Sequence, residues 1–154
     1  MIKYGEVILL LYDVTVTEKA YAKINLFLDC ERKRSDGYHD IVSVMQSVSL
    51  FDNVSVKIYE KGTDRLFCND PSVPCDERNL AYKALLAFRK HSGLEFFAEI
   101  HIDKKIPAAA GLAGGSSDAA AVLRALCTLS ETGFSDEELI KIAISVGSDV
   151  PFCV

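Results

Sequence analysis

The chain has 154 residues, of which 49% are hydrophobic and 25% are charged, a balance typical of one globular domain and unlike a disordered chain. Its 17 basic and 22 acidic residues give a net charge of -5, which argues against a nucleic-acid partner. The early apolar run from Val7 to Tyr12 is shorter than the roughly 20 residues of a membrane-spanning helix, so we expect a cytoplasmic protein without membrane contact.

The first part of the chain is predicted to form strands. Val7 to Tyr12 is either an extra edge strand or the remnant of a misassigned start codon. Residues alternate from Ala20 to Asp29, which is the period of a strand, and Asp36-Gly37 then suits a tight hairpin. Two further strands are expected at Ile41 to Ser49 and at Asn53 to Tyr59.

Helices dominate the second part. One is expected over Leu80 to His91, with Asn79 as N-cap and Gly93 as its end, followed by a strand at residues 96–102. Two more helices are expected over residues 117–129 and 135–146, the second with a capping box between Ser135 and Glu138. Strands followed by helices predict an α+β domain, with a mixed sheet and helices on one face.

Small residues surround the expected start of the helix at 117. Pro107, Gly111, Gly114 and Gly115 come directly before two serines and an alanine-rich stretch. A helix start offers unpaired N–H groups and partial positive charge, and glycine allows close approach of a ligand, so this loop is suited to a polyphosphate. It lacks the lysine of a Walker A loop, because Ser116 follows the last glycine, and the alternative is tight helix packing through small residues.

This loop resembles the phosphate loop of the GHMP small-molecule kinases. Three more segments support the resemblance: AYAKINLFL at residues 20–28, SDGYH at 35–39 and VGSDVPF at 146–152. Within the family, these segments are similar to those of the kinases that use ATP to phosphorylate the 2-hydroxyl of 4-diphosphocytidyl-2-C-methyl-D-erythritol. Those kinases act in the non-mevalonate isoprenoid pathway. The resemblance implies the GHMP kinase N-terminal fold, a ribosomal-protein-type α/β two-layer domain.

The resemblance also implies a domain organisation. Residues 1–154 correspond to the N-terminal ATP-binding domain, with residues 1–17 as an extra segment and with the family's C-terminal domain absent from this chain. We therefore expect weak turnover or none from the chain alone, and self-association through apolar surface near Phe152 and Cys153.

Five residues outside the loop have roles implied by the resemblance. Asp149 resembles a catalytic base, Lys23 the catalytic lysine that pairs with it, and Asn25 a residue that positions the substrate. Tyr38 and His39 resemble the pair that recognises the cytidine of a substrate carrying a cytidine diphosphate group, with the tyrosine stacking on the base and the histidine bonding its edge. Considered without the family, these residues are ordinary turn, sheet-surface and hairpin positions.

ATP and Mg²⁺ are the implied cofactors. Lys104 or Lys105 could assist with the phosphates, although paired lysines at a strand end are commonly plain surface. Ser117 and Asp118 are possible Mg²⁺ ligands, but Asp118 could serve only the helix start, so the metal site is left unassigned. The residues expected to hold ATP are Pro107, Ala108, Ala109, Ala110, Gly111, Leu112, Ala113, Gly114, Gly115, Ser116 and Ser117, with Asn79 and Leu80 beside the adenine.

Two other functions stay open at this point. The chain could be a GHMP kinase for another small alcohol such as homoserine or mevalonate, although these lack the base that the SDGYH segment is expected to recognise. It could also be a non-catalytic ATP-binding fragment.

Overall fold

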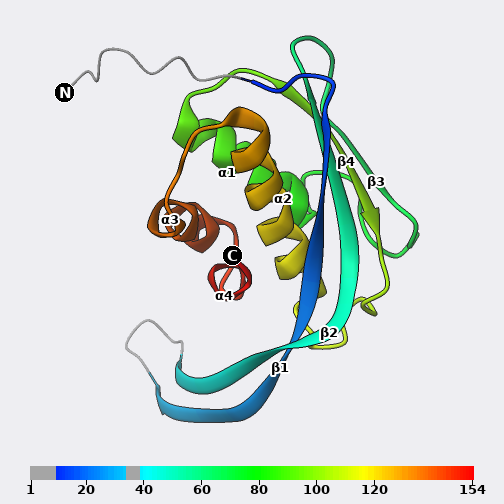
Figure 1. Cartoon of the computed structure of the whole chain (residues 1–154). Coiled ribbons are helices and arrows are strands. Elements are labelled where there is room, and N and C mark those ends of the chain that lie inside the picture. The colour runs from blue at the N-terminus through cyan, green and yellow to red at the C-terminus, as the bar shows by residue number, and fades with distance from the viewer. Residues whose placement is uncertain (1–9, 34–38) are drawn as a thin grey trace, which may run out of the picture.

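The computed structural model describes residues 10–33 and 39–154, and its centre is a mixed sheet of four strands. The strands are β1 (Thr15–Lys33), β2 (His39–Tyr59), β3 (Arg65–Cys68) and β4 (Phe97–Asp103). Their order is β1-β2-β4-β3, with β3 parallel to β4 and the other neighbours antiparallel. The long β1–β2 ribbon curves beyond the rest of the sheet (Figure 1).

Helices cover one face of this sheet (Figure 1). They are α1 (Leu80–Ser92), α2 (Gly114–Ser130), α3 (Asp136–Val146) and the single turn α4 (Val150–Cys153). The α+β prediction, with a mixed sheet and helices on one face, is confirmed. None of the helices in the described ranges is long and apolar enough to cross a membrane.

The predicted caps form as their residue types suggest. The Asn79 side chain accepts a hydrogen bond from the Ala81 N–H at 2.9 Å, and Gly93 ends α1 in the left-handed conformation, at a φ of 70°. Ser135 and Glu138 form the capping box of α3. Because these signals act within a few residues, they are readable without the tertiary fold.

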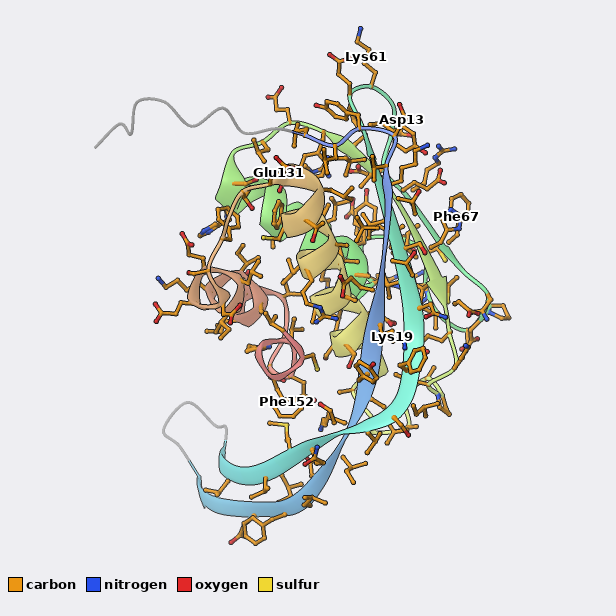
Figure 2. All side chains as sticks on the ribbon, viewed as in Figure 1. Asp13, Lys19, Lys61, Phe67, Glu131 and Phe152 are labelled. Atoms are coloured by element: carbon orange, nitrogen blue, oxygen red, sulfur yellow. The ribbon has the colours of Figure 1, made fainter. Side chains whose placement is uncertain are left out.

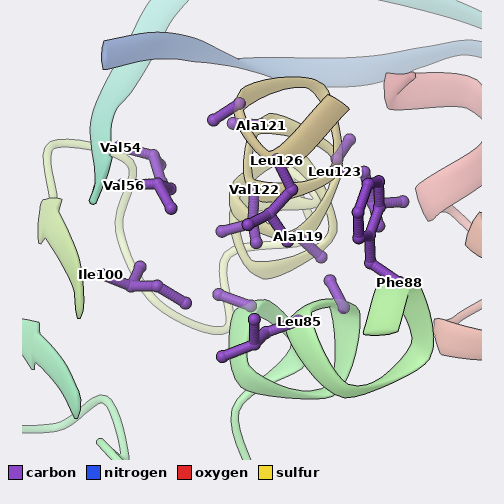
Figure 3. Packing of buried hydrophobic residues seen from close by; sticks show 14 of the residues in the cluster. Val54, Val56, Leu85, Phe88, Ile100, Ala119, Ala121, Val122, Leu123 and Leu126 are labelled. Atoms are coloured by element: carbon purple, nitrogen blue, oxygen red, sulfur yellow. The ribbon is translucent and has the colours of Figure 1, made fainter. Parts of the chain in front are cut away.

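The core lies between the sheet and α2. Val54 and Val56 on β2 and Ile100 on β4 are fully buried and face the helices, where Leu85 and Leu126 meet them (Figure 3). Helix α2 contacts both β1 and β2 as well as the other three helices. Its run of buried alanines keeps the helix thin enough to lie in the middle of the domain.

Some boundaries differ from prediction. The two strands expected between Ile41 and Tyr59 are one strand, β2, which bends along the curved ribbon. Strand β3 was not predicted, and α2 begins at Gly114 instead of residue 117. The described end of the early apolar run, residues 10–12, is not a strand: it packs on the core, and the Leu11 N–H bonds the Leu129 carbonyl at 2.8 Å. The Asp36-Gly37 turn lies outside the described residues.

Candidate active site

A cleft of about 410 Å³ opens beside the loop that precedes α2. The start of α1 forms another wall, and Asp149 at the start of α4 reaches the same space. The cleft thus joins three segments that are far apart in the sequence. Its lining is Val73, Pro74, Arg78, Asn79, Leu80, Lys104, residues 107–116, Asp118 and Asp149.

The loop backbone has an unusual conformation. Ala109, Gly111 and Ala113 have φ values of 56°, 74° and 57°, in the left-handed region that non-glycine residues adopt at a cost. Ala113 is the N-cap of α2, and its methyl side chain cannot cap the helix. The first N–H groups of α2 therefore border the cleft without a side-chain cap, which is the arrangement that binds an anion.

The glycines of the loop serve different purposes. Gly111 has the positive φ expected of a loop glycine, whereas Gly114 and Gly115 belong to the first turn of α2. A Cβ at Gly114 would lie 2.7 Å from Lys104 Nζ and 3.0 Å from Ile106 Cγ2. Glycine is therefore needed at 114 for packing rather than for backbone freedom.

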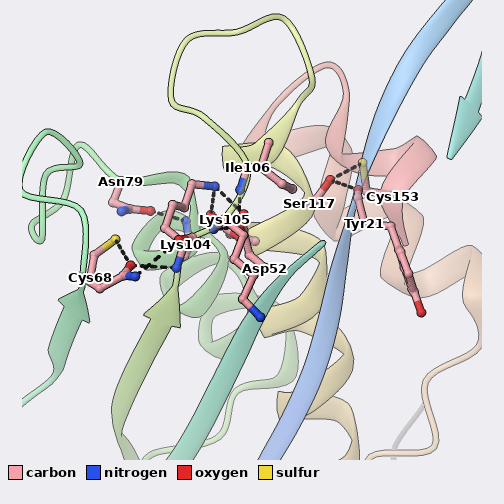
Figure 4. A network of polar contacts seen from close by, with 12 residues as sticks. Tyr21, Asp52, Cys68, Asn79, Lys104, Lys105, Ile106, Ser117 and Cys153 are labelled. Atoms are coloured by element: carbon pink, nitrogen blue, oxygen red, sulfur yellow. Dashed lines mark hydrogen bonds and ion pairs between the residues drawn. The ribbon is translucent and has the colours of Figure 1, made fainter. Parts of the chain in front are cut away.

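Lys104 forms a buried cluster with Asp52 and Asp118. Figure 4 shows Lys104 beside Asp52. Its Nζ donates to Asp52 Oδ2 at 2.6 Å and to Asp118 Oδ2 at 2.8 Å, and its side chain is only 5% exposed. Burial by itself lowers the pKa of Lys104, but Asp118 and Asp52 more than offset it and raise that pKa. Lys104 is therefore neither plain surface nor a free phosphate-binding cation.

The two carboxylates of this cluster differ in their environment. Asp52 Oδ1 accepts hydrogen bonds from the N–H groups of Lys105 and Ile106, so both of its oxygens are bonded. Asp118 Oδ1 is buried and has no hydrogen-bond partner. Burial and, to a smaller extent, the neighbouring Asp52 carboxylate raise the pKa of Asp118 to about 7, against the opposing effect of Lys104.

Asp52 is a site residue that the sequence prediction missed. A signal was present, because Asp52 continues the alternation of the buried residues Val54, Val56 and Ile58. A carboxylate on the buried face of a strand needs a cationic partner. The predicted strand started at Asn53, which left Asp52 out of that pattern.

Lys23, Asn25 and Asp149 lie close together. Lys23 Nζ is 3.5 Å from Asp149 Oδ2 and donates to Asn25 Oδ1 at 3.3 Å. The pairing of β1 with β2 shifts between Tyr21 and Lys23, so Ala22 and Lys23 are both buried in place of strict alternation. The Lys23 N–H also bonds the Leu112 carbonyl at 3.0 Å, which attaches β1 to the loop.

Arg124 holds the segment that carries Asp149. From α2 it donates to the Cys153 carbonyl at 2.7 Å, to the Lys19 carbonyl at 3.0 Å and to Glu18 Oε2 at 3.2 Å. These bonds connect α4 to β1 through α2. Phe152 projects from α4, and its side chain is 39% exposed (Figure 2).

The remaining predicted site residues divide into three groups. Asn79 and Leu80 line the cleft with the loop. Ser117 does not: its hydroxyl donates to the Tyr21 carbonyl at 2.6 Å and contacts Cys153 Sγ at 3.4 Å (Figure 4), so its part in ATP binding stays a prediction. Tyr38 and the side chain of His39 lie outside the described residues, and only the His39 backbone is placed, at the start of β2.

The fold and this cleft define a GHMP kinase N-terminal domain. Residues 79–154, just under half of the chain, match the family model described as GHMP kinases N terminal domain. The matched range starts at Asn79 and includes the loop, Asp118 and Asp149.

The chain is similar to 4-diphosphocytidyl-2-C-methyl-D-erythritol kinases of several bacteria. The chain is 48% identical to the 4-diphosphocytidyl-2-C-methyl-D-erythritol kinase of Clostridium kluyveri over 136 residues and 49% identical to that of Exiguobacterium sibiricum over 141, which is 88% and 92% of this chain. It spans about half the length of these relatives, 48% and 49%. A crystal structure of 4-(cytidine 5'-diphospho)-2C-methyl-D-erythritol kinase matches with a TM-score of 0.73 and 36% identity, over 90% of this chain and 48% of that one.

Proposed function

We propose that the chain supplies the ATP-binding part and the catalytic pair of an enzyme that phosphorylates the 2-hydroxyl of 4-diphosphocytidyl-2-C-methyl-D-erythritol. The observation that carries the proposal is the shared cleft, where the anion-binding loop and Asp149 face the same space. Phosphoryl transfer needs this combination, because the hydroxyl must be held in line with a cradled triphosphate. The similarity to kinases of that name supports the choice of substrate.

Each group at the cleft has a proposed part in the transfer. The substrate oxygen forms a bond to the γ-phosphorus as the bond to the β,γ-bridging oxygen breaks, and Asp149 accepts the hydroxyl proton. Lys23, 3.5 Å from Asp149, keeps that carboxylate in place, and Asn25, bonded to Lys23 Nζ, orients the substrate. Bound Mg²⁺ supplies charge neutralisation on the phosphates.

Nucleotide recognition is proposed at two places. Asn79 and Leu80 border the adenine of ATP, in agreement with their position in the cleft wall. Tyr38 and His39 take the cytidine, by stacking and by hydrogen bonds to the base edge. Stacking of a base on an aromatic ring contributes about 1 to 3 kcal/mol in nucleic-acid complexes.

ADP release by the chain with Mg-ATP tests the proposal. The three alcohols to compare are 4-diphosphocytidyl-2-C-methyl-D-erythritol, homoserine and mevalonate, with a thermal shift for ATP alone measured in parallel. Turnover with the cytidine compound alone supports the proposal, and turnover with either of the others contradicts the proposed substrate.

One observation favours a second candidate, ATP binding without turnover by this chain on its own. The Asp149 side chain is 39% exposed, and a base surrounded by water is held less firmly than catalysis needs. Stabilisation by ATP without ADP release in any of the three reactions supports this candidate.

The role of Asp149 has its own test, in a protein that shows turnover. Asp149→Asn should lower kcat by orders of magnitude while ATP affinity stays within a few fold, because only the proton acceptor is lost. Asp136→Asn, at an exposed carboxylate on α3, is the control and should leave both unchanged. Comparable turnover in Asp149→Asn and the control would remove the base assignment.

A further inference from the structure

We propose that Asp118 supplies a carboxylate oxygen to the divalent cation that accompanies the nucleotide phosphates in the cleft. The inference rests on the proposed function, because it requires a nucleotide at the loop. It also assigns Lys104 and Asp52 as positioning residues: Lys104 holds the Asp118 carboxylate in place, and Asp52 holds Lys104.

The free oxygen of Asp118 is the first argument. The residue is 2% exposed, it lines the cleft, and Lys104 Nζ occupies its Oδ2 and leaves Oδ1 without a partner. A buried carboxylate oxygen is ordinarily bonded, so an unbonded one beside a cleft indicates a ligand. Oxygen is also the ligand atom that Mg²⁺ prefers.

The charge of the cluster is the second argument. Lys104 carries one positive charge, and Asp52 alone would neutralise it, with both Asp52 oxygens fully bonded. The cluster thus holds two carboxylates against the one positive charge of Lys104, and it carries a surplus negative charge whenever Asp118 is ionised as well as Asp52. A surplus negative charge beside a phosphate site is unfavourable unless a cation lies between the two.

The position of Asp118 is the third argument. Asp118 follows the first turn of α2, whose leading residues Gly114, Gly115 and Ser116 line the same cleft. Mg²⁺ commonly uses one or two carboxylates together with substrate phosphates and water. The described part of the chain has no group of three acidic, histidine or cysteine side chains that could hold a metal alone, so the cation should bind together with the nucleotide.

The experiment measures how metal and nucleotide binding depend on each other. Mn²⁺ affinity is measured by electron paramagnetic resonance with and without the non-hydrolysable analogue AMP-PNP, and AMP-PNP affinity is measured by calorimetry with and without Mg²⁺. In the wild-type chain, each ligand should tighten the binding of the other by the same factor. Asp118→Asn should lower Mn²⁺ affinity in the presence of AMP-PNP at least tenfold.

The metal-free measurement separates a ligand from a structural residue. Asp118→Asn should bind AMP-PNP without metal as tightly as the wild type or more tightly, because a negative charge near the phosphates has been removed. Asp103→Asn, at an exposed carboxylate outside the cleft lining, should behave as the wild type in every arm. Equal losses of metal-free and metal-loaded AMP-PNP affinity in Asp118→Asn would show a structural role and overturn the proposal.

A measurement on the wild-type chain covers the case in which Asp118→Asn does not fold. With AMP-PNP bound, substoichiometric Mn²⁺ should broaden the amide NMR signals of Asp118 and its neighbours far more than those of α3. Unbroadened signals at Asp118, or unchanged Mn²⁺ affinity in a folded Asp118→Asn, would overturn the inference alone. Absence of AMP-PNP binding by the wild type would instead overturn the proposed function, and this inference with it.

Discussion

Replacing Gly114 by alanine tests whether the buried Lys104 is fixed in place. The new Cβ would lie 2.7 Å from Lys104 Nζ and 3.0 Å from Ile106 Cγ2, both closer than ordinary contacts. The end of a lysine can usually move aside at little cost. Here Nζ is held at 2.6 Å from Asp52 and 2.8 Å from Asp118, so movement weakens two buried ion pairs.

Gly115 provides the matched control. It is in the same first turn of α2, neither glycine has a positive φ, and a Cβ at 115 would meet only Leu80 Cδ1, at 3.9 Å. Both substitutions gain about 0.5 to 1 kcal/mol, because alanine is the better helix former. Only Gly114→Ala carries the overpacking cost of about 1 to 3 kcal/mol.

Urea unfolding measures the difference between the two variants. Gly115→Ala should be about 0.5 to 1 kcal/mol more stable than the wild type, and Gly114→Ala about 1 to 3 kcal/mol less stable than Gly115→Ala, with equal m-values. If the two variants are equally stable, Lys104 moves freely and the reasoning is refuted.

Two further predictions concern α4 and the start of α3. Arg124→Lys loses bonds to the Cys153 and Lys19 carbonyls, so amide exchange in α4 should quicken while exchange in α1 does not change; equal exchange in α4 would show that Arg124 does not hold it. Hydrogen bonds from the Ser135 N–H and hydroxyl lower the pKa of Glu138. The ionised Glu138 therefore stabilises the folded chain above the usual carboxyl pKa, and this stabilisation is lost as the pH falls through the lowered pKa. Ser135→Ala should raise the pKa of Glu138 part of the way to its usual value, since the N–H of residue 135 remains. Loss of the N-cap hydroxyl should lower the free energy of unfolding by about 1 kcal/mol. An unchanged pKa of Glu138 in an NMR titration would contradict this.

Much of the fold could be predicted from short-range patterns. Asn79, Gly93 and the capping box at Ser135 act on backbone groups within four residues, so residue type and spacing were sufficient to place α1 and α3. The alternation in β1 and β2 predicted strands for the same reason. The merging of two expected strands into β2 was not predictable, because it depends on how the ribbon bends along β1.

The candidate site was only partly visible in the sequence. The loop residues and Asp149 were expected in one site, and the structure brings them to one cleft. Ser117 was expected to face the nucleotide, but its hydroxyl bonds the Tyr21 carbonyl. That contact joins residues 96 positions apart, and no local pattern encodes it.

The sequence by itself determined where the helices cap, which strands alternate and where a loop rich in small residues meets a helix, because these properties depend on neighbours along the chain. Only the tertiary structure decided that Lys104 is buried between Asp52 and Asp118, that Gly114 makes room for it, and that one oxygen of Asp118 is left unbonded. The physical reason is burial. Once water is removed, each charge must find its partner on another element, and the fold alone determines which partner is within reach.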